Sequence, residues 1–260
     1  MEIFDHIDAL DRDGTLLADA ASAAGLRADV PGCPGWQVRD LLRHQAYVHR
    51  WAARHVAERA PEVIDDGLTE SDILAAAPSD DDLIAAYRDG HAALVATLRD
   101  ADPDVSCAMF MPAPSPLAFW ARRQAHETAV HRYDAQSAEP SGAPVPGAGF
   151  DPAFAADGVD ELIMCFAARR KYSPDDNGGG AEPTLAVRAT DADARWHVRF
   201  GGGGTTVSRD DQAADAVVEG TAAGLYAFLW NRCDAATAGL AISGQPEALA
   251  LWQASVRVRW

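Results

Sequence analysis

The segment from Arg122 to Asp134 carries the side chains best suited to chemistry. Glu127 and His131 are four residues apart, so on a helix their directions differ by only about 40° and they share a face. Asp134 follows three residues later on the same stripe. His126 and His131 are five apart, about 140° around a helix, which excludes the zinc-protease motif with histidines four apart. The segment therefore offers Glu127 and His131 as a ligand pair, and we expect His126 to point elsewhere.

A second pair of histidines, His44 and His49, lies in an earlier segment and is again five residues apart. His44 falls three residues after Leu41 and four before Val48, so we expect it to face inward with that apolar stripe and His49 to lie off it. One inward imidazole with the later Glu/His pair makes three nitrogen and oxygen ligands. This set suits zinc or another first-row divalent ion and leaves a position open for water or substrate. The alternatives are a hydrogen-bonded core histidine and an ordinary helix-stabilising Glu/His contact.

Helices must position these side chains, and the first half of the chain has the pattern of helices. Apolar residues recur at helical spacing in four ranges: 2–27, 36–59, 80–100 and 117–137. Proline-rich stretches at 31–35 and 112–116 break the pattern. Helices of this length with short connections predict an antiparallel four-helix bundle over residues 1–150.

The residue pattern changes in the second half of the chain. We expect a helix at about 152–171 in the connecting segment 151–174 and a small α+β domain over 175–260, which makes the whole chain α+β. Alternating residues predict strands at 184–188, 194–200, 216–218 and 240–244. The run Gly201–Gly204 is expected to be a turn between strands, and it lacks the lysine and the Ser/Thr of a phosphate-binding loop.

Charge and composition exclude several classes of function. The formal net charge is −17, from 39 acidic and 22 basic residues, which disfavours nucleic acid and anionic membranes as partners. A GC-rich or salt-adapted source would explain the acidity equally well. The first residues lack the basic start and apolar run of a signal peptide, and no stretch is apolar enough for a membrane span. The four cysteines are scattered without a C-x-x-C pair. We therefore expect a cytoplasmic protein, with its oligomeric state left open.

Two motifs resemble those of a known family. Residues 31–44, Pro-Gly-Cys-Pro-Gly-Trp-Gln-Val-Arg-Asp-Leu-Leu-Arg-His, resemble the C-P-G-W-x-V-x-D-L-L-x-H signature of the DinB-like, mycothiol-dependent maleylpyruvate isomerase family. Residues 123–134 resemble its second signature, and 156–161 and 229–232 are similar to its downstream elements. One departure is Ser-Gly-Gln-Pro at 243–246, where many relatives read Gly-Asp. The resemblance covers nearly the whole chain and implies a DinB-like bundle with a small C-terminal domain.

The resemblance also implies roles for individual residues. It makes His44, Glu127 and His131 the ligands of a divalent metal, with zinc the expected ion, and mycothiol the thiol cosubstrate. It makes Arg232 an anchor for an anionic substrate group. Asp134 is expected either to orient His131 or contact substrate, or else to be a solvated helix end.

The chemistry expected of such a centre is activation of a thiol. A free thiol has a pKa near about 8.5, and coordination to a dication deprotonates it. The thiolate could then attack an electrophilic, possibly carboxylate-bearing small molecule. Addition to a cis double bond, rotation and elimination would make an isomerase; retention of the thiol would make an S-transferase. Two alternatives stay open: metal-assisted hydrolysis by activated water, and a non-catalytic protein that binds a metal or small molecule.

Other side chains near the motifs are expected to be structural. Trp36 is expected to be a packing residue at the start of a helix. Cys33 is expected to be a buried, inert cysteine, with a place near the mouth of the site as the alternative. Arg122 and Arg123 lie one turn before the Glu/His pair; at least one of them is expected to be solvated, and pairing with a carboxylate substrate is the alternative.

Overall fold

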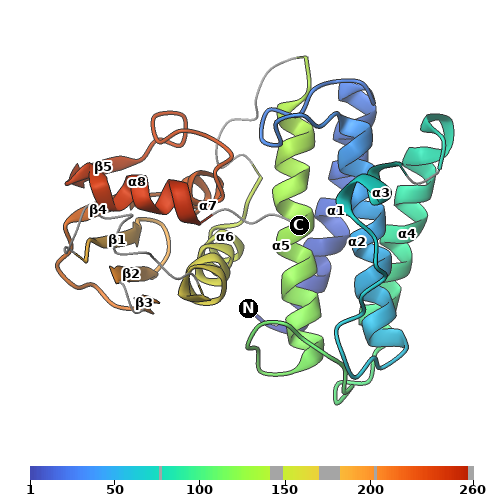
Figure 1. The fold of residues 1–260 in the computed structure, drawn as a ribbon, viewed down its shortest axis with the longest axis horizontal. Helices are drawn as coiled ribbons and strands as arrows, with labels where there is room; N and C mark the ends of the chain where they lie inside the picture. Colours follow the sequence, from blue (N-terminus) through green and yellow to red (C-terminus); the bar gives the residue numbers. More distant parts are fainter. Residues whose placement is uncertain (76–77, 141–148, 170–181, 202–203, 257–260) are drawn as a thin grey trace. The chain divides into compact units, whose positions relative to one another are not determined.

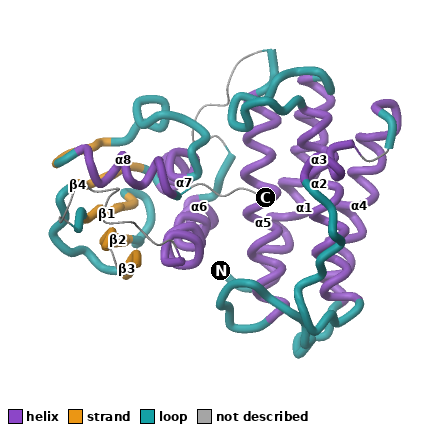
Figure 2. Tube along the Cα trace, viewed as in Figure 1, coloured by secondary structure: helices purple, strands orange, loops and turns teal. Residues whose placement is uncertain are grey.

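The computed structural model describes residues 1–75, 78–140, 149–169, 182–201 and 204–256. The chain divides into two compact units, Met1–Pro144 and Val145–Trp260. Figure 2 shows helices and loops in the first unit and a mixture of helices and strands in the second. The predicted α+β class, a helical bundle followed by a small domain with a sheet, is confirmed. Within the described ranges, no helix combines the length and apolarity needed to cross a bilayer.

The described part of the first unit contains five helices. They are α1 (Ile3–Ala24), α2 (Val38–Ala57), α3 (Glu70–Ala75), α4 (Asp80–Asp100) and α5 (Pro116–Ser137). The four long helices lie side by side, α1 and α2 each packing on both α4 and α5 (Figure 1). The four predicted helices are thus all present, and the short α3 was not predicted because its six residues are too few for a periodic apolar pattern.

Two helix pairs run parallel, unlike the antiparallel arrangement predicted. In the α1/α5 pair, His6 faces His126 and Asp13 pairs with Arg132 further along both helices. The α2/α4 pair also runs in one direction (Figure 1). The reason is the connection 58–79, which is long enough to return the chain to the end where α2 began. The other two connections, 25–37 and 101–115, are shorter and reverse the direction of the chain, as predicted.

Ile64 in the connection 58–79 is hydrogen-bonded to the C-terminal part of α2. The indole N–H of Trp51 donates to the carbonyl of Ile64 at 2.9 Å, and the backbone N–H of Ile64 donates to Nε2 of His55 at 2.9 Å. Nδ1 of His55 lies 2.8 Å from the carbonyl of Trp51. Because Nε2 accepts, the proton of a neutral His55 is on Nδ1 and is donated to Trp51. Burial lowers the pKa of His55, which favours this neutral form.

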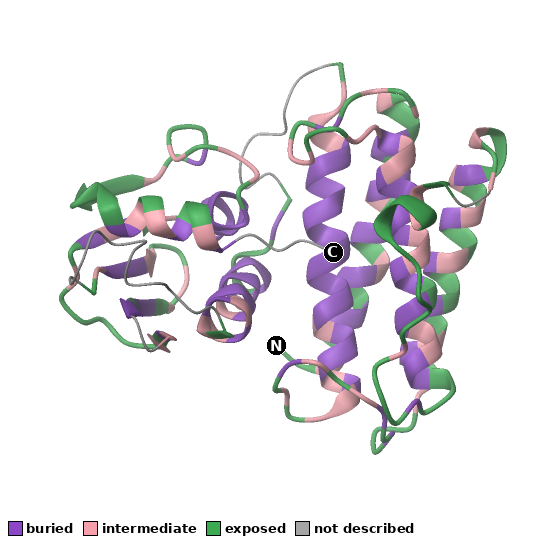
Figure 3. Cartoon of the chain, viewed as in Figure 1, coloured by how far each residue is buried: buried purple, intermediate pink, exposed green. Residues whose placement is uncertain are grey.

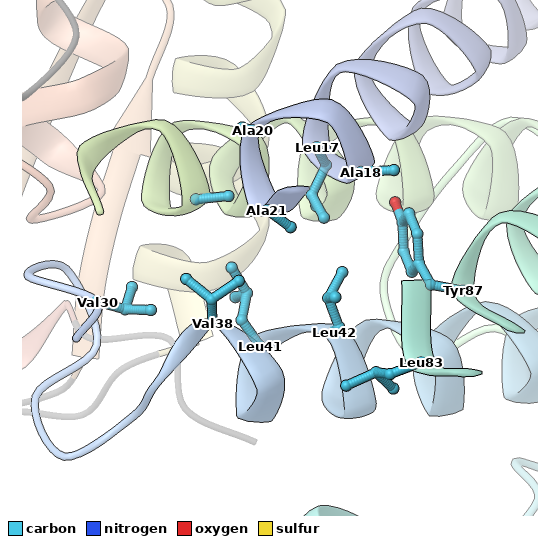
Figure 4. Close-up of a cluster of buried hydrophobic side chains, with 11 residues drawn as sticks. Leu17, Ala18, Ala20, Ala21, Val30, Val38, Leu41, Leu42, Leu83 and Tyr87 are labelled. Atoms are coloured by element: carbon cyan, nitrogen blue, oxygen red, sulfur yellow. The ribbon is translucent and has the colours of Figure 1, made fainter. Parts of the chain in front are cut away.

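A compact apolar cluster holds the helices together at the end of the bundle where α2 and α4 begin (Figure 4). Small residues of α1 allow close approach to the larger side chains of α2 and α4. The fully buried members include Leu17, Ala18, Leu41, Leu42, Leu83 and Tyr87. Each large side chain contributes about 1.5–3 kcal/mol on burial, so the cluster positions the start of α2 firmly.

Two glycines in the long helices should respond oppositely to alanine. A Cβ on Gly14 of α1 would lie 2.1 Å from the imidazole of His91, which is buried and held by the carbonyl of Leu10 at 3.0 Å. We therefore expect Gly14→Ala to lower the free energy of unfolding by about 1–3 kcal/mol through overpacking. A Cβ on Gly90 of α4 would meet nothing within 4 Å.

Gly90→Ala is the matched control for that prediction. In a helix interior with open space, alanine restrains the unfolded chain and should raise the free energy of unfolding by about 0.5–1 kcal/mol. Urea denaturation of both variants measures the two effects. If Gly14→Ala instead raised the free energy of unfolding, His91 would have to move aside without losing its packing contacts.

The described part of the second unit has a five-stranded sheet with flanking helices. Its strands are β1 (Thr184–Ala189), β2 (Arg195–Gly201), β3 (Gly204–Ser208), β4 (Ala216–Gly220) and β5 (Ala241–Gly244). The order is β3-β2-β1-β4-β5, with β1 and β4 parallel and the other neighbours antiparallel. Its helices are α6 (Pro152–Glu161), α7 (Ala222–Leu229) and α8 (Pro246–Ser255). Both α7 and α8 pack on β1 and β4, so these two strands lie at the core of the unit.

The second unit differs from the prediction in two places. The strand β3 was not predicted; it begins at Gly204, the last residue of the glycine run at 201–204, of which residues 202–203 lie outside the described residues. The helix predicted from about 152 to 171 is α-helical only to Glu161 and continues as a π-helical turn η1 (Leu162–Phe166) and a 3₁₀ turn η2 (Ala167–Arg169). The last predicted residues of that helix, 170–171, also lie outside the described ranges.

Candidate metal centre

Three side chains from α2 and α5 converge inside the first unit. Nε2 of His44 and Nε2 of His131 each lie 3.2 Å from the same oxygen, Oε1 of Glu127. One ligand atom from each residue lies within 4.8 Å of those of the other two. All three side chains are buried, with at most 5% of their surface exposed, and α5, which carries two of them, is buried along most of its length (Figure 3). Two helices therefore direct two imidazoles and one carboxylate at a common point.

The spacing of these donor atoms fits a divalent cation. Ligands about 2.0–2.1 Å from a tetrahedral zinc ion are separated by about 3.3 Å, close to the two 3.2 Å separations here. Such distances also suit hydrogen bonds. The choice of donors adds to the argument, because two imidazoles and a carboxylate are the usual protein ligands of a zinc site with an open position. The two separations and the choice of donors are those of a site that could hold a divalent ion such as zinc.

Glu127 is held on both of its oxygens. Oε1 also accepts from Nε2 of Gln45 at 3.2 Å, and Oε2 accepts from Nη2 of Arg123 at 2.8 Å. Burial would raise the pKa of Glu127, but hydrogen bonds from His131 and His44 and the charge of Arg123 outweigh it and hold the pKa well below its usual range. The carboxylate is therefore ionised and its Oε1 is aimed at the two histidines.

Asp134 positions the ring of His131. Its Oδ2 lies 2.9 Å from Nδ1 of His131, which leaves Nε2 directed at Glu127. Carboxylates commonly orient metal-binding histidines in this way. Burial would lower the pKa of His131, but contacts with Asp134, Cys33 and Glu127 raise it well above the usual value. Asp134 is fully buried, so its environment is not that of a solvated helix end.

His49 lies inside the bundle, so the prediction that it points away from the interior is wrong. It is fully buried, with Nε2 2.9 Å from Oγ1 of Thr128 and its ring beside Tyr87 and His91 of α4. Burial lowers its pKa to about 3, so it is neutral. The physical reason is that α2 is covered by α5 on one side and by α4 on another, and both histidines find a buried face. His44 alone of the two meets the Glu/His pair.

His126 and Arg232 are the two remaining residues that the sequence singled out. His126 points away from the three ligands, as expected, and its ring lies edge-on to that of His6 on α1 at 5.9 Å between centroids. Arg232 belongs to the second unit. It follows α7, is half-buried, and donates from Nη1 to the carbonyl of Trp230 at 2.8 Å. The structure therefore brings together His44, Glu127, His131 and Asp134.

Four further side chains surround the centre, of which only Cys33 was considered for such a place, as an alternative. Trp36 lies 5.1 Å from the ring of His44 and stacks at 6.4 Å on that of His131. Gln45 and Arg123 hold Glu127, and Arg123 is buried whereas Arg122 is partly exposed. Cys33 is half-buried rather than buried, and its Sγ lies 3.4 Å from Oδ2 of Asp134. The signal for Trp36 and Cys33 was their position in the motif that ends at His44; Gln45 and Arg123 were recognisable only from the contact between helices.

Comparisons with known proteins agree with this architecture. The family model for the mycothiol maleylpyruvate isomerase N-terminal domain matches residues 7–136, and the model for the MDMPI C-terminal domain matches residues 153–251. Crystal structures titled as a mycothiol-dependent maleylpyruvate isomerase and a mutant of it are similar over 94% of this chain and 95% of theirs, with a TM-score of 0.64 at 14% and 13% identity. At this identity the structural likeness shows a shared fold. A comparison with curated proteins found no match.

Proposed function

The chain belongs to the mycothiol maleylpyruvate isomerase family, and on that premise we propose that it is a metal-dependent enzyme that uses mycothiol to act on an electrophilic small molecule. The observation that carries the proposal is the convergence of His44, Glu127 and His131 on one point. We propose that these three side chains hold a zinc ion. Three protein ligands leave a coordination position for a substrate atom, whereas structural zinc sites usually have four protein ligands.

Zinc bound at this point would lower the pKa of a coordinated thiol, so that the thiolate is present at neutral pH. Side chains around the centre prepare this coordination position. Glu127 supplies one negative charge, and its pKa is held low by hydrogen bonds from His131 and His44 and by the charge of Arg123. Asp134 keeps the Nε2 of His131 directed at the common point. The ligands are buried, and this low-polarity setting strengthens their electrostatic effect on a bound sulfur.

Access to the centre is proposed to be from the side of Trp36 and Cys33. Both side chains are half-buried, while the three ligands are almost completely covered. The indole of Trp36 covers the rings of His44 and His131 and would limit the entry of bulk water. A thiol entering here would replace water at the open position.

We propose that the thiolate adds to an electrophilic carbon of the second substrate. In a maleylpyruvate-type isomerisation it adds across a cis double bond, the bond rotates, and elimination releases the trans product and the thiol. In an S-transfer the thioether product keeps the thiol. Arg232 is our candidate for binding a carboxylate of the second substrate, by a charge-assisted hydrogen bond.

Activity with and without thiol and metal tests the proposal. The purified full-length protein would be incubated with mycothiol and either maleylpyruvate or monochlorobimane, and products followed by mass spectrometry. We expect turnover that requires the thiol, falls to background after chelation and returns when zinc is added back. A product carrying the thiol indicates a transferase, and a trans isomer without it indicates an isomerase. Turnover that needs no thiol, or that survives complete metal removal, would contradict the proposal.

A further inference from the structure

His131 lies between two sets of donor atoms. Its Nε2 faces Oε1 of Glu127 at 3.2 Å, as described above. Its other nitrogen, Nδ1, lies 2.9 Å from Oδ2 of Asp134, and the Sγ of Cys33 is 3.4 Å from that same oxygen. One ligand atom from each of Cys33, His131 and Asp134 lies within 4.8 Å of the other two. Sulfur, nitrogen and oxygen donors thus gather at the opposite edge of the same imidazole.

We propose that Cys33, Asp134 and His131 form a second cation position, which selects thiophilic divalent ions and competes with the first for His131. This inference depends on the placement of these three side chains and does not require the thiol chemistry proposed above. A thiolate ligand favours soft ions such as cadmium, whereas the first set, with imidazole and carboxylate alone, has no sulfur donor. Cys33 is half-buried, so an ion can reach it from solvent.

The two positions exclude each other because a neutral imidazole has one lone pair and one N–H. With the lone pair on Nε2, His131 serves the first set and its Nδ1–H donates to Asp134. With the lone pair on Nδ1, it serves the second set and its Nε2–H donates to Glu127. In either tautomer the single N–H of the ring donates to a carboxylate, and the lone pair on the other nitrogen is the one that a bound ion would take. The ring therefore accommodates either position without moving away from its partners.

The distances in the second set suit an ion with small adjustments. Tetrahedral zinc with one sulfur and one oxygen ligand separates those atoms by about 3.5 Å, and Sγ of Cys33 and Oδ2 of Asp134 are 3.4 Å apart. The 2.9 Å separation of Nδ1 and Oδ2 is shorter, because it is the hydrogen bond that an ion would replace. A slight turn of the Asp134 carboxylate would complete the set.

Cadmium binding to the metal-free full-length protein tests the inference, because a cadmium–thiolate bond has an ultraviolet charge-transfer absorption. We expect the native chain to develop this band on titration and Cys33→Ser to lose it. Mutation of residues that only orient metal ligands weakens metal binding by about 10- to 100-fold. Loss of a direct ligand should therefore weaken cadmium binding at least about tenfold. Circular dichroism would verify that the serine variant folds.

Two further variants separate this result from the first metal site. His44→Gln removes a ligand of the first set only and should keep the band, whatever the outcome of the activity assays. Cys233→Ser changes the half-buried cysteine of the second unit and should also keep it. A native chain that binds cadmium without the band, a band that persists in Cys33→Ser, or a band lost in His44→Gln would each overturn the inference.

Discussion

Replacing His44 with alanine should lower the affinity of the protein for zinc by at least about a hundredfold. Partners that merely orient ligands are worth about 10- to 100-fold, and His44 supplies a donor atom itself. In the structure its Nε2 lies 3.2 Å from Glu127, the carboxylate that also meets His131. Competition with a chromophoric chelator measures the affinity. Activity that depends on the metal should fall in parallel.

His49→Ala is the matched control. This residue is on the same helix and equally buried, but its Nε2 contacts Thr128 instead of the Glu/His pair. We expect its removal to reduce the free energy of unfolding, because it leaves a cavity and an unpaired hydroxyl in the core, while the zinc affinity stays close to that of the native chain. Equal losses of zinc affinity in the two variants would show that the assignment of the ligands is wrong.

Asp13→Ala should reduce the free energy of unfolding by about 3–5 kcal/mol, the usual result of removing one partner of a buried ion pair. Oδ1 of Asp13 on α1 lies 2.9 Å from Nε of Arg132 on α5, and both side chains are at most 2% exposed. The variant leaves a buried guanidinium without this carboxylate. Urea denaturation of the metal-free protein measures the change.

An exposed ion pair provides the comparison. Asp19 and Arg88 are closer, at 2.7 Å, but their side chains are 60% and 44% exposed. Asp19→Ala should therefore change the free energy of unfolding by no more than about 1 kcal/mol. The double variant Asp13→Leu with Arg132→Met should be less destabilised than Asp13→Ala alone, because it removes both charges. Similar values for Asp13→Ala and Asp19→Ala would show that burial does not govern the strength of these pairs.

Periodicity was enough to predict the long helices and the inward faces that carry the three side chains of the centre. Glu127 and His131 are four apart on one helix, and His44 shares the apolar stripe of another, so helix geometry alone places each on an inward face. Which inward faces meet was suggested by the resemblance to a known family. The structure brings these three side chains together.

Features that depend on contacts between helices could not be predicted from the sequence. The interior position of His49 arises because α4 covers a second face of α2. Arg123 is buried because its charge is matched by Glu127, and side-chain type alone predicts solvent exposure. The parallel pairs of helices depend on where the connection 58–79 returns the chain. The short α3 has too few residues for a periodic signal, and β3 begins at the last glycine of a run that was expected to be a turn.

The contact of His55 with Ile64 makes the connection after α2 acid-labile. Protonated His55 would present an N–H to the backbone N–H of Ile64, and this hydrogen bond would be lost. Burial lowers the pKa of His55 in the folded state, so as the pH falls the unfolded chain takes up a proton first. The stabilisation is complete above the ordinary histidine pKa of about 6.5 and is lost as the pH drops through the lower folded value. His55 lies about 16 Å along α2 from His44, so acid that protonates His55 would break this hydrogen bond at a distance from the side chains proposed to hold the metal.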